Sequence, residues 1–171
     1  SLDSNDHLLE LIKEKLGDDW GIEINQILPK CFDYKLFSEA DNATIAVRAK
    51  NTVVDIWPGL VEKIYGVSID IGSTTLAVNL SDLQTGEVLA SEGSMNPQIR
   101  FGEDLMSRVS YCMLNPGSEK KLTETVRDSI KQLVIKACET HKIDPEQILE
   151  ATVVGNPVMH HLFLGFDPVP L

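Results

Sequence analysis

Cysteine is scarce in this sequence, and no two cysteines stand close together. Cys31, Cys112 and Cys138 are too widely spaced for a C-x-x-C pair, which argues against a structural zinc site or an iron–sulfur cluster built within this chain. Cys138 falls on an apolar helical stripe, and we interpret it as a small buried hydrophobic residue. Scattered thiols fit a reducing compartment, so we expect a cytoplasmic protein.

Long apolar runs and excess positive charge are also absent. No stretch of about eighteen apolar residues occurs, so we expect no membrane-spanning helix. The formal net charge is −11 over 171 residues, and a surface this acidic repels nucleic acid, so we expect no nucleic-acid partner. The chain begins with Ser1 rather than Met, which fits an excised piece of a longer protein as well as processing.

Two common nucleotide-binding signatures are missing as well. No G-x-x-x-x-G-K-[ST] sequence occurs, which excludes a P-loop, and the dinucleotide-binding fingerprint G-x-G-x-x-G is absent. Any phosphate site in this chain must therefore use another motif.

What the chain does contain falls into two parts that meet near Pro58-Gly59, a pair that breaks the preceding pattern. Residues 1–60 read as a small α+β domain. Helices are expected over 6–16 and 22–33, and two β-branched segments, 43–49 and 52–57, predict a hairpin or two sequential strands.

Residues 65–171 show a different order of elements. Three short strands joined by tight turns predict an antiparallel meander, which is followed by helices, a buried strand and a last helix. The expected strands are 66–70, 76–82, 87–95 and 151–154. The expected helices are 102–113, 119–141, one that restarts at 144–147, and a segment starting at 155–157. This β-β-β-α-β-α order predicts one ribonuclease H-like unit, the kind that actin-like ATPases use twice, in a chain of mixed α+β and α/β class.

The segment that carries chemistry is V-S-I-D-I-G-S-T-T, residues 67–75. Asp70 ends a buried-type strand, where a carboxylate can hold hydrated Mg²⁺ or orient a water molecule. Gly72 removes side-chain bulk, so that backbone N–H groups can approach a phosphate. The hydroxyls of Ser73, Thr74 and Thr75 add further donors. The alternative is an ordinary hairpin whose turn happens to have this sequence.

Residues 66–75 resemble the first phosphate motif of the acetate and sugar kinase/Hsp70/actin superfamily. More specific blocks surround it, at 65–66, 82–90, 96–99, 102–104, 107–108 and 154–162, the last reading V-G-N-P-V-M-H-H-L. Together these blocks resemble the reductive activators of corrinoid proteins, including the activators of methylamine methyltransferase and O-demethylase systems. The resemblance covers essentially the whole chain. Residues 1–60 look like that family's middle domain, and 65–171 look like the start of its ATPase domain.

The resemblance implies a reaction, cofactors and a partner. Such activators use ATP and Mg²⁺ to help a low-potential electron reach cob(II)alamin and restore cob(I)alamin in the corrinoid protein of a methyltransferase system. The family's [2Fe–2S] domain is N-terminal and is marked by four grouped cysteines, which this sequence lacks. A second phosphate motif and the adenosine-binding glycines are missing after Leu171. We therefore expect a segment truncated at both ends and inactive alone.

The same resemblance assigns roles to seven positions. Asp70 would be the catalytic acid that binds the Mg²⁺ water, and Gly72, Ser73, Thr74 and Thr75 the phosphate hairpin. Gly155 is placed with the nucleotide-binding residues. Asn156 would be a catalytic or substrate-contacting residue, and its alternative role is to start a helix before Pro157.

Other polar residues allow two interpretations each. The segments 96–98 and 103–104 either line the cleft or face the corrinoid partner, and the two acids also suit a solvated helix start. Arg100 and Arg108 either contact phosphate or, as we favour, form surface ion pairs. For His160 and His161 we expect core or capping roles, because adjacent helical residues point about 100° apart and cannot easily share one metal ion.

Three other functions stay open. A metabolite kinase of the same superfamily would need an acceptor pocket beyond Leu171. A ribonuclease H-type nuclease would need three or four carboxylates around two metal ions, and the strands supply mainly Asp70. A binding module without turnover is the third, and a homodimer formed through the face that a second half would cover stays open too.

Overall fold

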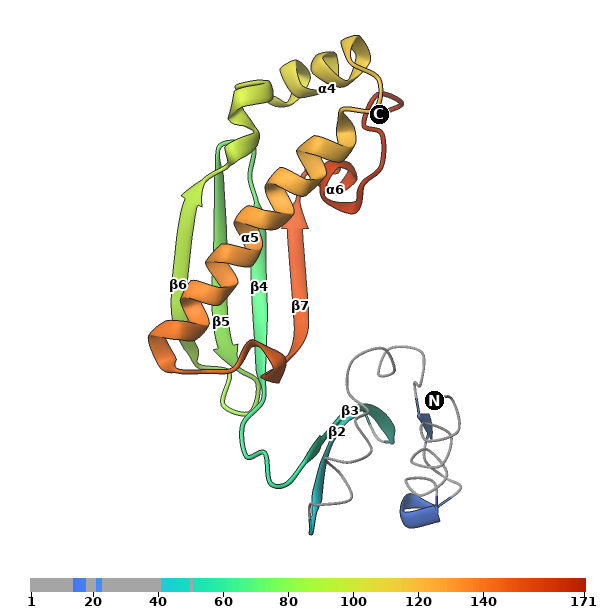
Figure 1. The fold of residues 1–171 in the computed structure, drawn as a ribbon, viewed down its shortest axis with the longest axis vertical. Helices are drawn as coiled ribbons and strands as arrows, with labels where there is room; N and C mark the ends of the chain where they lie inside the picture. Colours follow the sequence, from blue (N-terminus) through green and yellow to red (C-terminus); the bar gives the residue numbers. More distant parts are fainter. Residues whose placement is uncertain (1–13, 18–20, 23–40, 50) are drawn as a thin grey trace. The chain divides into compact units, whose positions relative to one another are not determined.

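The computed structural model describes residues 14–17, 21–22, 41–49 and 51–171. The chain divides into two compact units, Ser1–Glu62 and Lys63–Leu171, which are coloured along the sequence in Figure 1. In the described part of the chain, no helix combines the length and the apolar composition that crossing a lipid bilayer requires.

The first unit contains a three-stranded sheet with the order β1-β3-β2. Strands β2 (Ala43–Arg48) and β3 (Thr52–Pro58) pair antiparallel, which confirms the predicted hairpin, and a bulge follows Ala46. Strand β1 (Gly21–Ile22) pairs parallel with β3 and was not predicted. The helix expected over 6–16 is described only at 14–16, which is helical. The helix expected over 22–33 lies outside the described residues except for residue 22.

The second unit is built on a four-stranded sheet with the order β6-β5-β4-β7. Strand β4 pairs antiparallel with β5 and parallel with β7, and β5 pairs antiparallel with β6. The strands are β4 (Tyr65–Ile71), β5 (Thr75–Asp82), β6 (Val88–Met95) and β7 (Ile148–Gly155). The helices are η1 (Pro97–Phe101), α4 (Leu105–Leu114), α5 (Glu119–His141), η2 (Pro145–Gln147) and α6 (Pro157–Leu164). Apart from η1, which the sequence did not predict, this is the predicted succession of elements.

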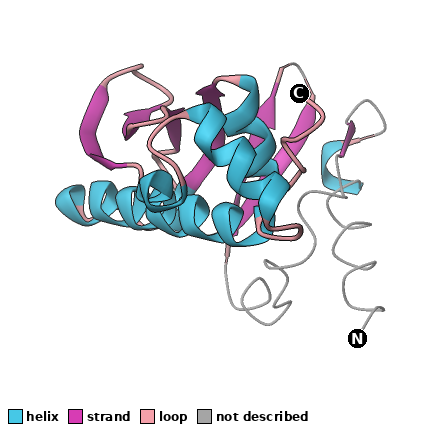
Figure 2. Cartoon of the chain, turned by 90° about the horizontal axis from the view of Figure 1, so that it is seen from above, coloured by secondary structure: helices cyan, strands magenta, loops and turns pink. Residues whose placement is uncertain are grey.

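The core of this unit lies between the sheet and α5, which crosses one face of it (Figures 1 and 2). In β5 the residues Leu76, Val78 and Leu80 are buried and alternate with more exposed ones, as the two-residue period of a strand requires. They face the apolar stripe of α5, in which Leu122 and Val126 have no exposed surface. Burying each such side chain stabilises the fold by about 1.5–3 kcal/mol.

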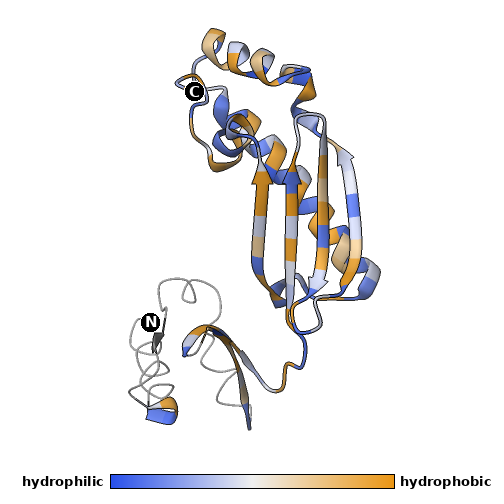
Figure 3. Cartoon of the chain, turned by 180° about the vertical axis from the view of Figure 1, so that it is seen from behind, coloured by the Kyte–Doolittle hydropathy of each residue, from blue (hydrophilic) through white to orange (hydrophobic). Residues whose placement is uncertain are grey.

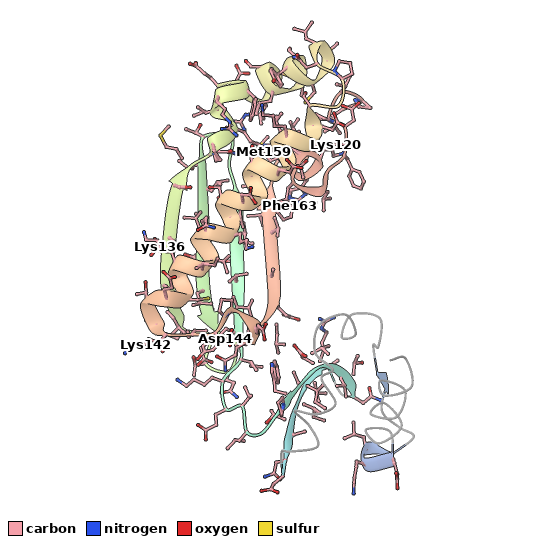
Figure 4. All side chains as sticks on the ribbon, viewed as in Figure 1. Lys120, Lys136, Lys142, Asp144, Met159 and Phe163 are labelled. Atoms are coloured by element: carbon pink, nitrogen blue, oxygen red, sulfur yellow. The ribbon has the colours of Figure 1, made fainter. Side chains whose placement is uncertain are left out.

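The opposite face of the sheet is seen in Figure 3, where the edge strand β6 is mostly hydrophilic or neutral. The polar residues Ser68, Asn79 and Ser91 form a row of hydrogen bonds across β4, β5 and β6 on this face. On the α5 side, Lys136 pairs with Glu92 of β6 at 2.6 Å (Figure 4). The two faces of the sheet therefore differ in polarity.

Three strands of this sheet, β4, β6 and β7, run toward the same end (Figure 1). The turn after β4, the helix η1 after β6 and the helix α6 after β7 consequently meet there. All seven positions that the sequence assigned to the site lie at or next to this end.

Candidate functional site

The turn between β4 and β5 has its backbone carbonyls occupied from inside the protein. The Gly72 carbonyl accepts a hydrogen bond from Asn96 Nδ2 at 2.8 Å, and the Thr74 carbonyl accepts one from the Asn96 backbone N–H, also at 2.8 Å. The Ser73 carbonyl accepts a hydrogen bond from Arg108 Nη2. The Thr75 carbonyl accepts from the Gly72 N–H at 3.0 Å and closes the turn.

The amide groups of the same turn point the other way. In a trans peptide the carbonyl and the following N–H are antiparallel, and the chain has no cis peptide among its described residues. Inward carbonyls at Gly72 and Ser73 therefore direct the N–H groups of Ser73 and Thr74 outward. Neither N–H donates to any acceptor within the described residues. Successive free backbone N–H groups of this kind form a concavity that binds anions.

Side chains around the turn add to its capacity for hydrogen bonding. Thr74 and Thr75 are exposed, Ser73 is half-buried, and their hydroxyls are not engaged within the described residues. Gly72 is required by close packing, since a Cβ there would lie 2.7 Å from the Thr75 carbonyl oxygen. The residue types at 72–75 therefore fit a turn that presents donors to an anion.

Asp70 lies two residues before the turn, on the face of the sheet opposite α5. Its neighbours Ile69 and Ile71 are buried in the core, so the alternation of the strand turns Asp70 to the other side, where it is exposed. Among the described residues its carboxylate has neither a hydrogen bond nor an ion pair. A free carboxylate beside unpaired amides is a donor set suited to a hydrated Mg²⁺ with a phosphate.

Gly155 and Asn156 stand next to the turn at the end of β7. Gly155 pairs in register with Ile71, and a Cβ on it would lie 3.0 Å from the Ile71 carbonyl oxygen. Asn156 caps α6, because its side chain accepts a hydrogen bond from the Met159 N–H at 3.0 Å. The helix-start role is therefore present at Asn156, and its Nδ2 group has no protein partner in the described part of the chain.

A buried polar cluster lies directly beneath the turn. Asn96, Gln98 and Arg108 each have no exposed surface. Asn96 also accepts from the Gln98 N–H at 2.9 Å and so caps η1, while Gln98 Nε2 donates to the Leu122 carbonyl at 3.0 Å. The expectation that residues 96–98 line a cleft or face a partner is therefore wrong for Asn96 and Gln98, since both are consumed in supporting the turn.

The expectation of a surface ion pair is also wrong for Arg108. Its guanidinium is fully buried, and this burial lowers the pKa of Arg108. The negative charge of Asp104 offsets part of that lowering of the pKa. Arg100 is exposed, as expected, but its bond is to the Thr125 hydroxyl at 2.8 Å. Asp104 caps α4 by accepting from the Ser107 N–H at 2.7 Å, which holds its pKa below the ordinary value.

Neither the cysteines nor the histidines of this unit form a metal site. Cys112 and Cys138 are buried, and burial raises the pKa of both thiols, while Cys31 lies outside the described residues. His161 Nδ1 lies 3.1 Å from the Asp167 carbonyl oxygen, and His160 Nε2 is buried without a hydrogen bond. The described segments bring no three His, Cys, Asp or Glu side chains together as metal ligands would be.

Similarity to known proteins adds a second line of observation. A family model described as "RACo middle region" matches residues 65–171, whereas the sequence resemblance placed the family's middle domain at residues 1–60 and the start of its ATPase domain at 65–171. The chain is 30% identical over 141 residues to the corrinoid activation enzyme RamQ of Eubacterium limosum, which corresponds to 81% of this chain and 24% of RamQ.

A solved structure gives the same result. The protein described as "Reductive activator for corrinoid,iron-sulfur protein" matches with a TM-score of 0.72 and 30% sequence identity, over 92% of this chain and 26% of its own. The chain therefore spans about a quarter of the length of the relatives it matches.

Proposed function

This chain belongs to the RACo family, the reductive activators of corrinoid proteins, and we propose that it supplies the first phosphate-binding turn of an ATP site in such an activator. The observation that carries this proposal is the turn at 72–75, with its carbonyls bound inside and the N–H groups of Ser73 and Thr74 free. The chain spans about a quarter of each relative, so we propose the complete reaction for a longer protein that contains these residues.

The residues of the turn fit a polyphosphate. Ser73 and Thr74 would donate their backbone N–H groups, and the hydroxyls of Ser73, Thr74 and Thr75 would add further donors to phosphate oxygens. Asp70 would hold a water of the Mg²⁺ shell, since Mg²⁺ keeps several waters and needs few carboxylates when phosphates bind it too. The Nδ2 group of Asn156 would contact substrate, with its cap to α6 holding the side chain in place.

The fold supports the same assignment. Lys63–Leu171 has three antiparallel strands, a helical crossover and a fourth strand parallel to the first, and we propose that it is one ribonuclease H-like subdomain of an actin-like ATPase. Residues 1–60 would form a separate small α+β domain. The second phosphate motif and the adenosine pocket would come from parts of the activator outside this chain.

The reaction that we propose for the complete activator is the transfer of one electron to cob(II)alamin, giving cob(I)alamin in a corrinoid protein of a methyltransferase system. ATP, when bound, supplies the free energy of its hydrolysis to ADP and phosphate. The [2Fe–2S] centre that carries the electron would lie in another domain of the activator. This segment's own task is to bind and orient the phosphates.

The test is ATP-dependent reduction of the corrinoid protein by a complete activator containing these residues. Asp70→Asn should abolish the ATP-dependent loss of the cob(II)alamin electron paramagnetic resonance signal. Asp128→Asn is the matched control, since Asp128 is exposed on α5 away from the turn, and it should reduce cob(II)alamin at the wild-type rate. Equal rates for the wild type and Asp70→Asn would contradict the proposal.

A further inference from the structure

Arg108 is the largest fully buried side chain in the described part of the chain. It extends from α4 beneath the turn at 72–75 and bonds to four residues, which lie in η1 and its C-cap, in α6 and in the turn. Nε donates to the Gly102 carbonyl at 3.0 Å, Nη1 lies 3.3 Å from Gln98 Oε1 and 3.2 Å from Met159 Sδ, and Nη2 donates to the Ser73 carbonyl. Met159 is labelled at this end of the sheet in Figure 4.

All of these acceptors are neutral. Within the described residues no carboxylate lies within ion-pair distance of the guanidinium, and the acid that acts on it electrostatically is Asp104, the cap of the same helix. A guanidinium keeps its proton in proteins, so the interior beneath the turn carries a positive charge. Burying a charge without an opposite charge is costly, and packing alone would be served equally well by an apolar side chain.

The bond to Ser73 fixes one peptide group of the turn. With the Ser73 carbonyl held inward by Arg108, the N–H of Thr74 must point outward, because the two groups are antiparallel in a trans peptide. Asn96 holds the Gly72 and Thr74 carbonyls in the same way. Arg108 therefore contributes both the direction of a free N–H and a positive charge behind it.

We propose that Arg108 is a positioning residue for phosphate binding, which orients the Ser73–Thr74 peptide and places a buried positive charge behind the turn. This inference rests on the proposed function, since it assumes that the turn binds phosphate. Arg108 is covered by the turn itself and by α6, so it acts through the Ser73–Thr74 peptide and does not touch the ligand.

The experiment is a titration of the ¹⁵N-labelled 171-residue chain with inorganic pyrophosphate, followed at the amides of Ser73 and Thr74. We expect the wild type to bind with a Kd of about 1 mM, because the chain provides part of a site. Arg108→Lys keeps the charge but cannot reproduce the planar fork, and it should weaken binding about tenfold, the effect of losing a hydrogen bond to a charged group. Arg108→Met should weaken binding further.

Arg127→Met is the matched control. Arg127 also donates to a backbone carbonyl, that of Phe163, at 2.7 Å, but it is exposed on α5, and its replacement should leave the Kd within about twofold of the wild type. A second measurement uses the wild type alone. In the wild type, pyrophosphate should shift the Nε resonance of buried Arg108 and leave that of Arg127 unchanged.

The outcomes separate the two proposals. No shift at Ser73 or Thr74 in the wild type would overturn the proposed function, and this inference with it. Wild-type binding together with a folded Arg108→Lys of unchanged Kd would overturn the role of Arg108 alone. If both Arg108 variants unfold, an unmoved Arg108 Nε resonance in the bound wild type would overturn it, and a shift there with none at Arg127 would support it.

Discussion

Replacing Gly72 by Ala tests whether the turn at 72–75 is held as tightly as its contacts indicate. An added Cβ would lie 2.7 Å from the Thr75 carbonyl oxygen, a backbone atom that also accepts the Gly72 N–H bond at 3.0 Å. Relieving the clash costs about 1–3 kcal/mol, and losing the bond that closes the turn costs about 0.5–1.5 kcal/mol. We expect a total of about 1.5–4.5 kcal/mol.

Gly93→Ala is the control for this substitution. Gly93 lies in β6 of the same sheet, and its added Cβ would meet the Leu76 carbonyl oxygen at 3.4 Å, an ordinary contact. Because Gly in a strand is less stable than Ala by about 0.5–1 kcal/mol, we expect the control to be neutral or slightly stabilising.

The assay must report on the second unit, and tryptophan fluorescence does not, because Trp20 and Trp57 both precede Lys63. Native-state hydrogen exchange at the buried β5 residues Val78 and Leu80 measures its unfolding free energy directly. Equal protection of these amides in Gly72→Ala and Gly93→Ala would refute the close packing that we ascribe to the turn.

Substitutions at three further positions have defined outcomes. Asn156→Ala should lower the free energy of unfolding by about 0.5–2 kcal/mol, because it removes the cap of α6. Asn156→Asp should keep that stability but abolish ATP hydrolysis in a complete activator. Wild-type hydrolysis by Asn156→Asp would mean that Asn156 serves only as a helix cap. Two backbone N–H groups lower the pKa of Asp82 below the ordinary 3.8, so its stabilisation is present above that pH and is lost as the pH falls through the folded pKa. In urea unfolding, the free energy of unfolding should therefore fall less between about pH 6 and pH 3 in Asp82→Asn than in the wild type. An equal fall in the two proteins would contradict a stabilising role for the Asp82 carboxylate. Leu122→Ala should cost about 2–5 kcal/mol by hydrogen exchange, against less than about 0.5 kcal/mol for exposed Met113→Ala; similar losses would contradict the placement of the core.

The strands and the long helix of the second unit could be predicted because their patterns are strong. The alternation of residues 76–82 and the apolar stripe of 119–141 leave little choice of structure. Boundaries were less predictable. The helix expected over 102–113 is α4, Leu105–Leu114, because Asp104 caps it, and the helix expected to restart after Asp144 is the single turn Pro145–Gln147.

The positions of the candidate site were also accessible from the sequence. Asp70 and Gly155 lie at the ends of β4 and β7, the turn follows β4, and the order of the strands brings three strand ends to one place. The role of each side chain was harder to predict. Asn156 and Asp104 both cap helices, and a residue type suited to capping does not reveal from the sequence whether it also contacts a ligand.

The support beneath the turn was missed, although one signal for it exists. Arg108 falls on the same helical face as Leu105, Val109 and Cys112, at spacings of three and four residues, so its position marks it as inward-facing. A charged side chain is ordinarily assigned to the surface, and this general preference outweighed the local pattern. Asn96 gave no such signal, since its role depends on a carbonyl twenty-four residues earlier in the chain.

The most direct test of the central claim uses Mn²⁺ in place of Mg²⁺ with ATP, because the paramagnetic ion broadens the signals of nearby amides. In the labelled chain we predict broadening at Asp70, Ser73, Thr74 and Gly155, at the end of the sheet where β4 and β7 finish, and none at Glu87 at the other end. Broadening should disappear in Asp70→Asn. Broadening centred elsewhere, or spread evenly over the chain, would contradict a phosphate site at this turn.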